Sequence, residues 1–282
     1  MKPRVLQFLA FVLVLGTWGF AEALEPLKLY DNFEQPLINP AKWFGSQFEA
    51  PNRFGGSFRE LIRKTTQEEH HLRLLGRAYS DNGLTDGISL SLFRLGFTRP
   101  DTITAIRSRV QVRNVDSTGC ALNPLPTLAT AQIFGFFFNT TATVPGDGTN
   151  DVIANVQVQR RSDSIDPPDI LEISYSVNLC LDRDCVGITT LGGGILGTVK
   201  TGEWVRLLLQ WDRNQDRFIF QRDREQPAFV SYTGFSDAAP PGIQLKTLGA
   251  DHFIANCATN PTPVGMVDAI FDNVFVNQSA LP

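Results

Sequence analysis

The feature that most constrains the fold is a hydrophobic pattern of period two within residues 202–223. Its apolar positions are Val205, Leu207, Leu209 and Trp211, then Phe218 and Phe220 after a polar segment at 212–216. Successive side chains of a strand point to opposite faces, so this period predicts two strands joined by a turn, each with one buried face. Strands of the same kind are predicted at residues 103–112, 131–139, 152–160, 171–179 and 269–276. The sequence therefore predicts an all-β protein, built as a large antiparallel β-sandwich with long loops.

Residues 1–23 have the features of a secretory signal peptide. Lys2 and Arg4 precede an apolar run at 6–20, and Ala21-Glu22-Ala23 is a small-x-small cleavage site. The run is shorter than the about 20 apolar residues that span a bilayer. We expect residues 24–282 to form a single domain, secreted or periplasmic, with no membrane span after signal cleavage.

The net charge of −4 at pH 7 is mildly acidic. Nonspecific binding of nucleic acid requires clustered basic residues, so a nucleic-acid partner is not expected. The sequence does not indicate an oligomeric state.

Four cysteines follow the predicted signal peptide, and they allow three pairings. A Cys180–Cys185 bridge would fasten one turn, and a Cys120–Cys257 bridge would close a long loop; this is the pairing that we expect. A metal knuckle at Cys180 and Cys185 is disfavoured, because no histidine lies nearby and thiols oxidise outside the cytoplasm.

Three segments carry a resemblance to a known superfamily. They are Asp31-Asn32-Phe33-Glu34, the Trp-rich hairpin that starts at 204, and Ile270-Phe271-Asp272-Asn273-Val274. Together they resemble the concanavalin A-like lectin/glucanase superfamily. The resemblance implies a jelly-roll β-sandwich over nearly all of residues 24–282, with the first and last strands side by side. It also implies a polysaccharide or glycan partner. No cofactor is required, but a structural Ca²⁺ held by Asp31 or Asp272 is implied.

Motifs of the catalytic branches are missing or incomplete. Family 16 glucanases carry E-x-D-x-x-E, whereas Asp169 and Glu172 here are three residues apart and would face opposite sides of a strand. Arg59-Glu60-Leu61 and Gln132-Ile133-Phe134 partly match alginate-lyase strands, with phenylalanine where those enzymes have histidine. We therefore predict no catalytic residue and favour a non-catalytic function. A divergent glycoside hydrolase or polysaccharide lyase, using acids among Glu60, Asp169 and Glu172, is the alternative.

Polar residues alternate along three predicted strands, and they define the candidate binding surface. An antiparallel sheet with one solvated face shows the same alternation, so the pattern alone does not establish a site. If the strands share a sheet, amides, hydroxyls and guanidinium groups suited to sugars would line one face. The candidate ligand-binding residues are Arg107, Arg109, Asn155, Gln157, Glu172 and Ser174, with Trp43 as a stacking ring.

This surface predicts a lectin-like carbohydrate-binding module. The remaining alternative is an extracellular structural or adhesion domain that presents its loops to a protein partner. Residues 191–197 are glycine-rich and are predicted to form a loop between two strands.

Overall fold

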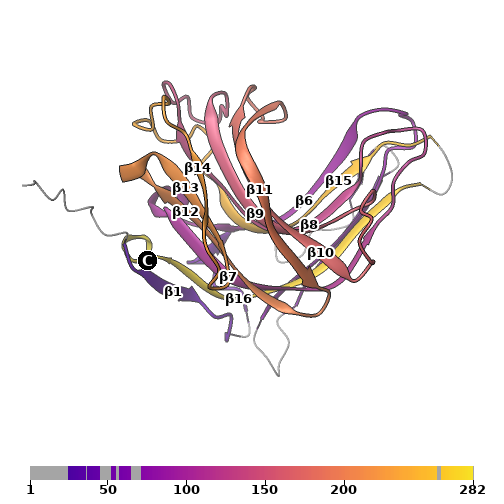
Figure 1. The fold of residues 1–282 in the computed structure, drawn as a ribbon, viewed down its shortest axis with the longest axis horizontal. Coiled ribbons are helices and arrows are strands. Elements are labelled where there is room, and N and C mark those ends of the chain that lie inside the picture. The colour runs from indigo at the N-terminus through magenta and orange to yellow at the C-terminus, as the bar shows by residue number, and fades with distance from the viewer. Residues whose placement is uncertain are drawn as a thin grey trace, which may run out of the picture.

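The computed structural model describes residues 25–35, 37–44, 52–54, 57–64, 71–258 and 262–281. The predicted signal peptide, residues 1–23, lies outside this part of the chain. The described strands form two antiparallel sheets packed face to face (Figure 1). This confirms the predicted all-β sandwich. The described residues contain no helix that is long and apolar enough to cross a membrane.

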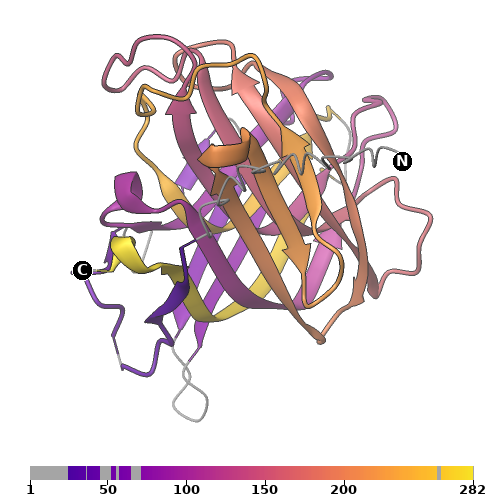
Figure 2. The same cartoon turned by 60° about the vertical axis from the view of Figure 1, so that its left-hand side comes forward.

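The larger sheet has nine described strands. Their order is β14 (Ala228–Ser231), β13 (Arg217–Arg222), β12 (Trp204–Asp212), β7 (Ala105–Ser117), β16 (Val264–Asn277), β5 (Leu72–Tyr79), β4 (Ser57–Lys64) and β3 (Asn52–Phe54), with β1 (Leu27–Asp31) also paired to β16. In Figure 2 the orange strands β12 and β13 lie beside the purple β7 and the yellow β16, although these segments are far apart in sequence.

The smaller sheet has seven described strands. Their order is β11 (Ile188–Lys200), β10 (Ile170–Cys180), β9 (Asp151–Arg161), β8 (Leu128–Asn139), β15 (Lys246–Ala255), β6 (Ile88–Phe97) and β2 (Trp43–Phe44). Three short 3-10 helices complete the described elements: η1 (Pro100–Thr102), η2 (Arg213–Gln215) and η3 (Gln278–Ala280).

The predicted hairpin at 202–223 is confirmed. β12 and β13 pair with Trp211 opposite Phe218, and η2 makes the turn between them. Asp216 closes this turn in the left-handed region, with φ 45°. The alternating side chains Leu207 and Leu209 are completely buried between the sheets, as a strand with one buried face requires.

The first and last described strands lie side by side, as the resemblance implied. β1 pairs antiparallel with β16, from Leu27 opposite Asn277 to Asp31 opposite Val274. Figure 1 shows the C-terminus beside β1.

The glycine-rich segment 191–197 is not a loop, which corrects the prediction. It lies inside edge strand β11, whose register against β10 shifts twice. Gly197 has φ +119° beside one shift, and a Cβ on Gly193 would come within 2.6 Å of the Tyr175 carbonyl oxygen. The glycines therefore permit the register shifts and the close approach of β10. A glycine-rich sequence of this kind also occurs in turns, so the sequence alone did not indicate a strand.

Both predicted disulfides are present. Cys120 and Cys257 are joined with 5.7 Å between their Cα atoms, and Cys180 and Cys185 with 4.8 Å. Cys257 follows β15 of the smaller sheet and Cys120 follows β7 of the larger one. The first bridge therefore ties the two layers together.

Candidate functional site

The predicted polar surface is divided between the two sheets. Arg107 and Arg109 lie on β7 in the larger sheet, whereas the amide and hydroxyl residues lie on β9 and β10 in the smaller sheet. Each row points away from the shared core, because its alternating neighbours Ile106 and Val156 are completely buried. The expectation of one combined surface is corrected: these residues form two surfaces on opposite sides of the sandwich.

We call the first surface the amide face. It covers the outer side of β8, β9 and β10, and its residues are Gln132, Asn155, Gln157, Gln159, Glu172, Ser174, Ser176 and Asn178. Cross-strand register places Gln132 opposite Gln157 and Gln157 opposite Ser174. All eight side chains are buried or half-buried. The polar groups thus form a continuous, partly shielded patch.

Hydrogen bonds join the side chains of the amide face into a chain. The Nδ2 of Asn155 donates to the Oε1 of Gln157 at 2.9 Å, and the Nε2 of Gln157 donates to the Oε1 of Gln159 at 2.6 Å. Gln159 donates in turn to Glu172, and Ser176 donates to Asn155. Each amide is oriented by its neighbours, which fixes donors and acceptors in place.

A charged pair that the sequence analysis did not identify lies beside this chain. Arg94 on β6 donates through Nε to the Oδ2 of Asp251 on β15 at 2.7 Å. Gln132 donates to the same oxygen, and the Oδ1 of Asp251 accepts the backbone N–H of Phe93 at 3.1 Å. The Arg94 guanidinium lies 4.1 Å from the ring centroid of Phe134. The alternation of Phe93, Leu95 and Phe97, all buried, is the sequence pattern that could have revealed β6.

The outer side of the same sheet is apolar at β2 and β6, which β15 separates from the amide face. Phe44 is 45% exposed, and so is Leu90. A Cβ on Gly96 would come within 2.2 Å of the Phe44 ring. Since Gly96 alternates with Leu95, which is completely buried, the ring covers Gly96 on the outer side of the sheet.

Trp43 does not belong to this apolar surface, which corrects its predicted role as an exposed ring. It is 3% exposed and packs in the core, with ring centroids 4.5 Å from Phe97 and 5.3 Å from Tyr30. Adjacent residues on a strand point in opposite directions. Phe44, the neighbour of Trp43, therefore provides the exposed ring.

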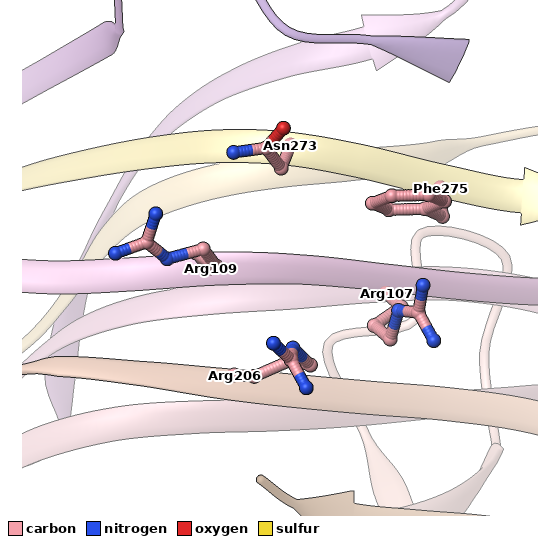
Figure 3. A pocket seen from close by; sticks show the side chains of 5 residues that line it. All are labelled: Arg107, Arg109, Arg206, Asn273 and Phe275. Carbon is pink, nitrogen blue, oxygen red and sulfur yellow. The ribbon is translucent and has the colours of Figure 1, made fainter. Parts of the chain in front are cut away.

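The second surface is a cavity of about 340 Å³ on the larger sheet, which we call the arginine depression. It is lined by Arg107, Arg109, Arg206, Asn273 and Phe275, from the adjacent strands β7, β12 and β16 (Figure 3). Figure 3 shows the three arginine side chains grouped below Asn273 and Phe275.

Aromatic rings hold two of these arginines. The Arg107 guanidinium carbon lies 4.3 Å from the ring centroid of Phe275, and that of Arg109 lies 4.5 Å from Trp204. Burial lowers the pKa of Arg107, and the nearby positive charge of Arg206 lowers it further. The depression therefore concentrates positive charge in a protein of net charge −4.

The two carboxylates considered for calcium already have protein partners. Asp31 accepts the indole Nε1 of Trp43 at 2.7 Å and the backbone N–H of Phe33 at 2.9 Å. Asp272 accepts the backbone N–H of Asn273 at 2.7 Å, and its Oδ2 lies 3.5 Å from Arg109 Nη1. The described residues contain no group of three or more His, Cys, Asp or Glu that could hold a metal ion. The calcium site stays a prediction.

Glu172 of the amide face and Asp251 beside it do not form a glycosidase pair. Asp251 and Glu172 lie in one cross-strand row, three strands apart through Thr130 and Gln159. This spacing separates their Cα atoms by roughly 14 Å, whereas paired catalytic carboxyl groups lie about 5–5.5 or 6.5–9.5 Å apart. Asp169 is exposed just before β10.

The other acid named for the enzymatic alternative, Glu60, lies on β4 of the larger sheet. It is therefore on a different layer from Glu172.

Comparison with known proteins gives structural resemblances only. No family model matches the sequence, and no curated protein matches it. The chain resembles a glycoside hydrolase family 16 endo-glucanase from Bacteroides ovatus, with 8% identity and TM-score 0.44 over 87% of this chain and 98% of that chain. It resembles a β-1,3-glucanase from Mycobacterium marinum, with 11% identity and TM-score 0.39 over 89% of this chain and 100% of that chain.

A third resemblance is to the carbohydrate-binding module CBM66 from Bacillus subtilis, with 13% identity and TM-score 0.35 over 78% of this chain and 93% of that chain. With identities and TM-scores this low, none of these likenesses carries an assignment of activity.

Proposed function

We propose that the protein is a secreted or periplasmic module that binds polysaccharide without cleaving it, with the amide face as its binding surface. The observation that carries this proposal is the hydrogen-bonded chain of Asn155, Gln157, Gln159 and Glu172. An exposed ring, Phe44, lies on the same side of the sheet, four strands away from Asn155.

The chemistry of the amide face suits sugar hydroxyls. A hydroxyl both donates and accepts, and an amide offers both functions at one planar group. The side chains of Gln157 and Asn155 are already oriented by their neighbours, so less conformational freedom is lost when a ligand binds. Phe44 on β2 and Leu90 on β6 are exposed, and each offers apolar surface to the C–H face of a sugar ring, as in sites that combine apolar contact with a few polar groups.

The arrangement of acids supports a non-catalytic role. Asp251 is completely buried and bonded to Arg94 and Gln132. Glu172 accepts a hydrogen bond from Gln159 and lies three strands from Asp251. Binding at this face is therefore expected to leave the glycosidic bond intact.

Disulfides support export. Cross-links such as Cys120–Cys257 and Cys180–Cys185 persist in oxidising compartments, where extracellular polysaccharides also occur.

A glycan array probed with residues 24–282 tests the proposal, followed by titration of the polysaccharide that binds. Replacing Gln157 by Ala is expected to weaken binding by about tenfold, the effect of about one lost hydrogen bond. Gln111→Ala is the matched control. Gln111 also lies on the outer side of a sheet, but this is the larger sheet, and its amide donates to the Gly202 carbonyl.

Two results would contradict the proposal. If no glycan on the array bound, or if wild type and the Gln157 variant bound equally well, the amide face would have no role in carbohydrate binding. Either result would favour a protein partner. New reducing ends in the bound polysaccharide, abolished by Glu172→Gln, would show a hydrolase instead.

A further inference from the structure

We propose that the arginine depression is a second binding site, which takes an oxyanion group, a sulfate ester or a carboxylate, carried by an acidic polysaccharide. It lies on the larger sheet, on the other side of the sandwich from the amide face. The two sites can therefore be tested separately.

The first argument is the arrangement of charge. Arg109 on β7 and Arg206 on β12 lie directly opposite each other in register, and like charges in this position repel. Asp272 lies 3.5 Å from Arg109, but neither Arg107 nor Arg206 has an ion-pair partner among the described residues. An anion between the arginines would replace this repulsion with charge-assisted hydrogen bonds.

The second argument is that the arginines are held in place. The guanidinium groups of Arg107 and Arg109 lie against the rings of Phe275 and Trp204, which restricts their movement. The Nε of Arg107 is buried and has no hydrogen-bond partner in the described part of the protein. A buried donor without an acceptor is destabilising, and an oxyanion would supply acceptor oxygens in the same depression.

The third argument concerns the size of the ligand. A cavity of about 340 Å³ is at the lower end of small-ligand sites, so it suits one charged sugar unit rather than a broad macromolecular contact. Nucleic acid binds through many phosphate contacts over an extended basic surface, which a protein of net charge −4 does not offer. Planar guanidinium forks bind carboxylates and tetrahedral oxyanions in two-point fashion.

Titrations with dextran sulfate, polygalacturonate and neutral dextran test the proposal. Wild-type protein is expected to bind at least one of the two polyanions at low salt, and more weakly at high salt. Neutral dextran has no anionic group and measures any binding at the amide face. Arg206→Gln is expected to weaken polyanion binding by tenfold or more. Arg183→Gln is the matched control, since it removes the same charge from an exposed position in the loop between β10 and β11.

Either polyanion supports the site, and the preference between them identifies the group, sulfate or carboxylate. The proposal would be overturned if the wild-type protein bound neither polyanion. So would equal weakening by Arg206→Gln and Arg183→Gln, because that result would reflect net charge alone.

A second variant controls for loss of binding through misfolding. Arg107→Lys keeps the charge but loses the planar fork, so it is expected to weaken polyanion binding with the melting temperature retained. Arg206→Gln should keep the binding of any neutral polysaccharide that Gln157→Ala loses. Failure of one site therefore does not depend on failure of the other.

Discussion

Arg94 and Asp251 form a close ion pair beside the amide face, on the outer side of the smaller sheet. The Nε and Nη2 of Arg94 lie 2.7 and 2.6 Å from the Oδ2 of Asp251, whose side chain is completely buried. Gln132 and the backbone N–H of Phe93 complete the hydrogen bonding of this carboxylate. The pair joins β6 to β15 and presents Gln132 to the neighbouring amides, so it positions the candidate binding surface.

Removing the carboxylate should destabilise the fold strongly. Asp251→Ala removes the carboxylate that pairs with Arg94 at a largely buried position, and breaking such a pair costs about 3–5 kcal/mol. Asp163→Ala is the control, because Asp163 pairs with Arg161 at an exposed site and exposed pairs contribute at most about 1 kcal/mol. Urea unfolding measures both free energies, and equal losses would mean that the Asp251 pair has no special structural role.

Trp43 and Phe44 give a second prediction, because adjacent residues have opposite surroundings. Trp43→Ala should lower the free energy of unfolding by about 3–5 kcal/mol, as expected for a buried aromatic ring. Phe44→Ala should change it by less, since the ring is 45% exposed, but should weaken polysaccharide binding by about tenfold if its stacking is worth about 1.4 kcal/mol. Thermal or urea unfolding and glycan titration on both variants separate the two roles; unchanged binding by Phe44→Ala would remove the ring from the site.

Strands β7, β9 and β10 illustrate what the sequence could predict. Alternation identified β9 and β10 and the outward direction of Asn155, Gln157, Glu172 and Ser174, because side-chain direction on a strand is a local property. Whether β7 shares their sheet depends on pairing between distant segments, which alternation does not encode. The prediction that Arg107 and Arg109 share a surface with these residues is therefore wrong, although the predicted outward direction of both arginines is correct.

The Arg94–Asp251 pair could not be predicted from alternation either. β15 is buried on both sides at Asp251 and His252, so it lacks the simple alternation of a strand with one solvated face. Trp43 was misplaced because composition does not indicate which of two adjacent aromatic residues points inward. Only the register of the two-residue strand β2 against β6 decides this.

Lys246 should make stability depend on pH in a defined direction. Its Nζ is buried, donates to the Pro100 carbonyl at 2.7 Å and lies 4.7 Å from the Phe137 ring centroid. Removal from water lowers the pKa of Lys246 from 10.5 to about 7, against a smaller opposing effect of Asp101. Between these two values the unfolded chain holds a proton that the native protein lacks, so stability rises with pH across this window.

Lys246→Met tests this dependence, because it keeps an unbranched side chain without the charge. The difference in unfolding free energy between wild type and variant should be constant below pH 7 and should shift in favour of wild type above it, by at most about 1.4 kcal/mol per pH unit. Urea unfolding on both sides of pH 7 measures the slope. Parallel curves for the two proteins would show that Lys246 keeps its ordinary pKa.

The two disulfides should contribute unequally. Cys120 and Cys257 are 137 positions apart, and Cys180 and Cys185 only 5. Cross-linking restricts the unfolded chain more when the loop is longer. Replacing Cys120 and Cys257 by Ser should therefore lower the free energy of unfolding by up to about 5 kcal/mol, and replacing Cys180 and Cys185 by Ser should lower it by about 2 kcal/mol. Urea unfolding of the two double variants gives the comparison; a larger loss from the shorter loop would show that native contacts rather than chain entropy dominate.

Chelation tests whether Asp31 or Asp272 holds calcium. Each oxygen of Asp31 already accepts an N–H group, from Trp43 or Phe33, and a cation at Asp272 would meet the Arg109 guanidinium 3.5 Å away. Calcium usually takes six to eight oxygen ligands, so an ion at either carboxylate requires these side chains to rearrange around it. The predicted site should therefore show a melting temperature that falls in EDTA and recovers with added calcium. Asp31→Ala should still lower the stability by about 1–3 kcal/mol, because it leaves the buried Trp43 donor without an acceptor. Equal melting temperatures in EDTA and in calcium would contradict the calcium site.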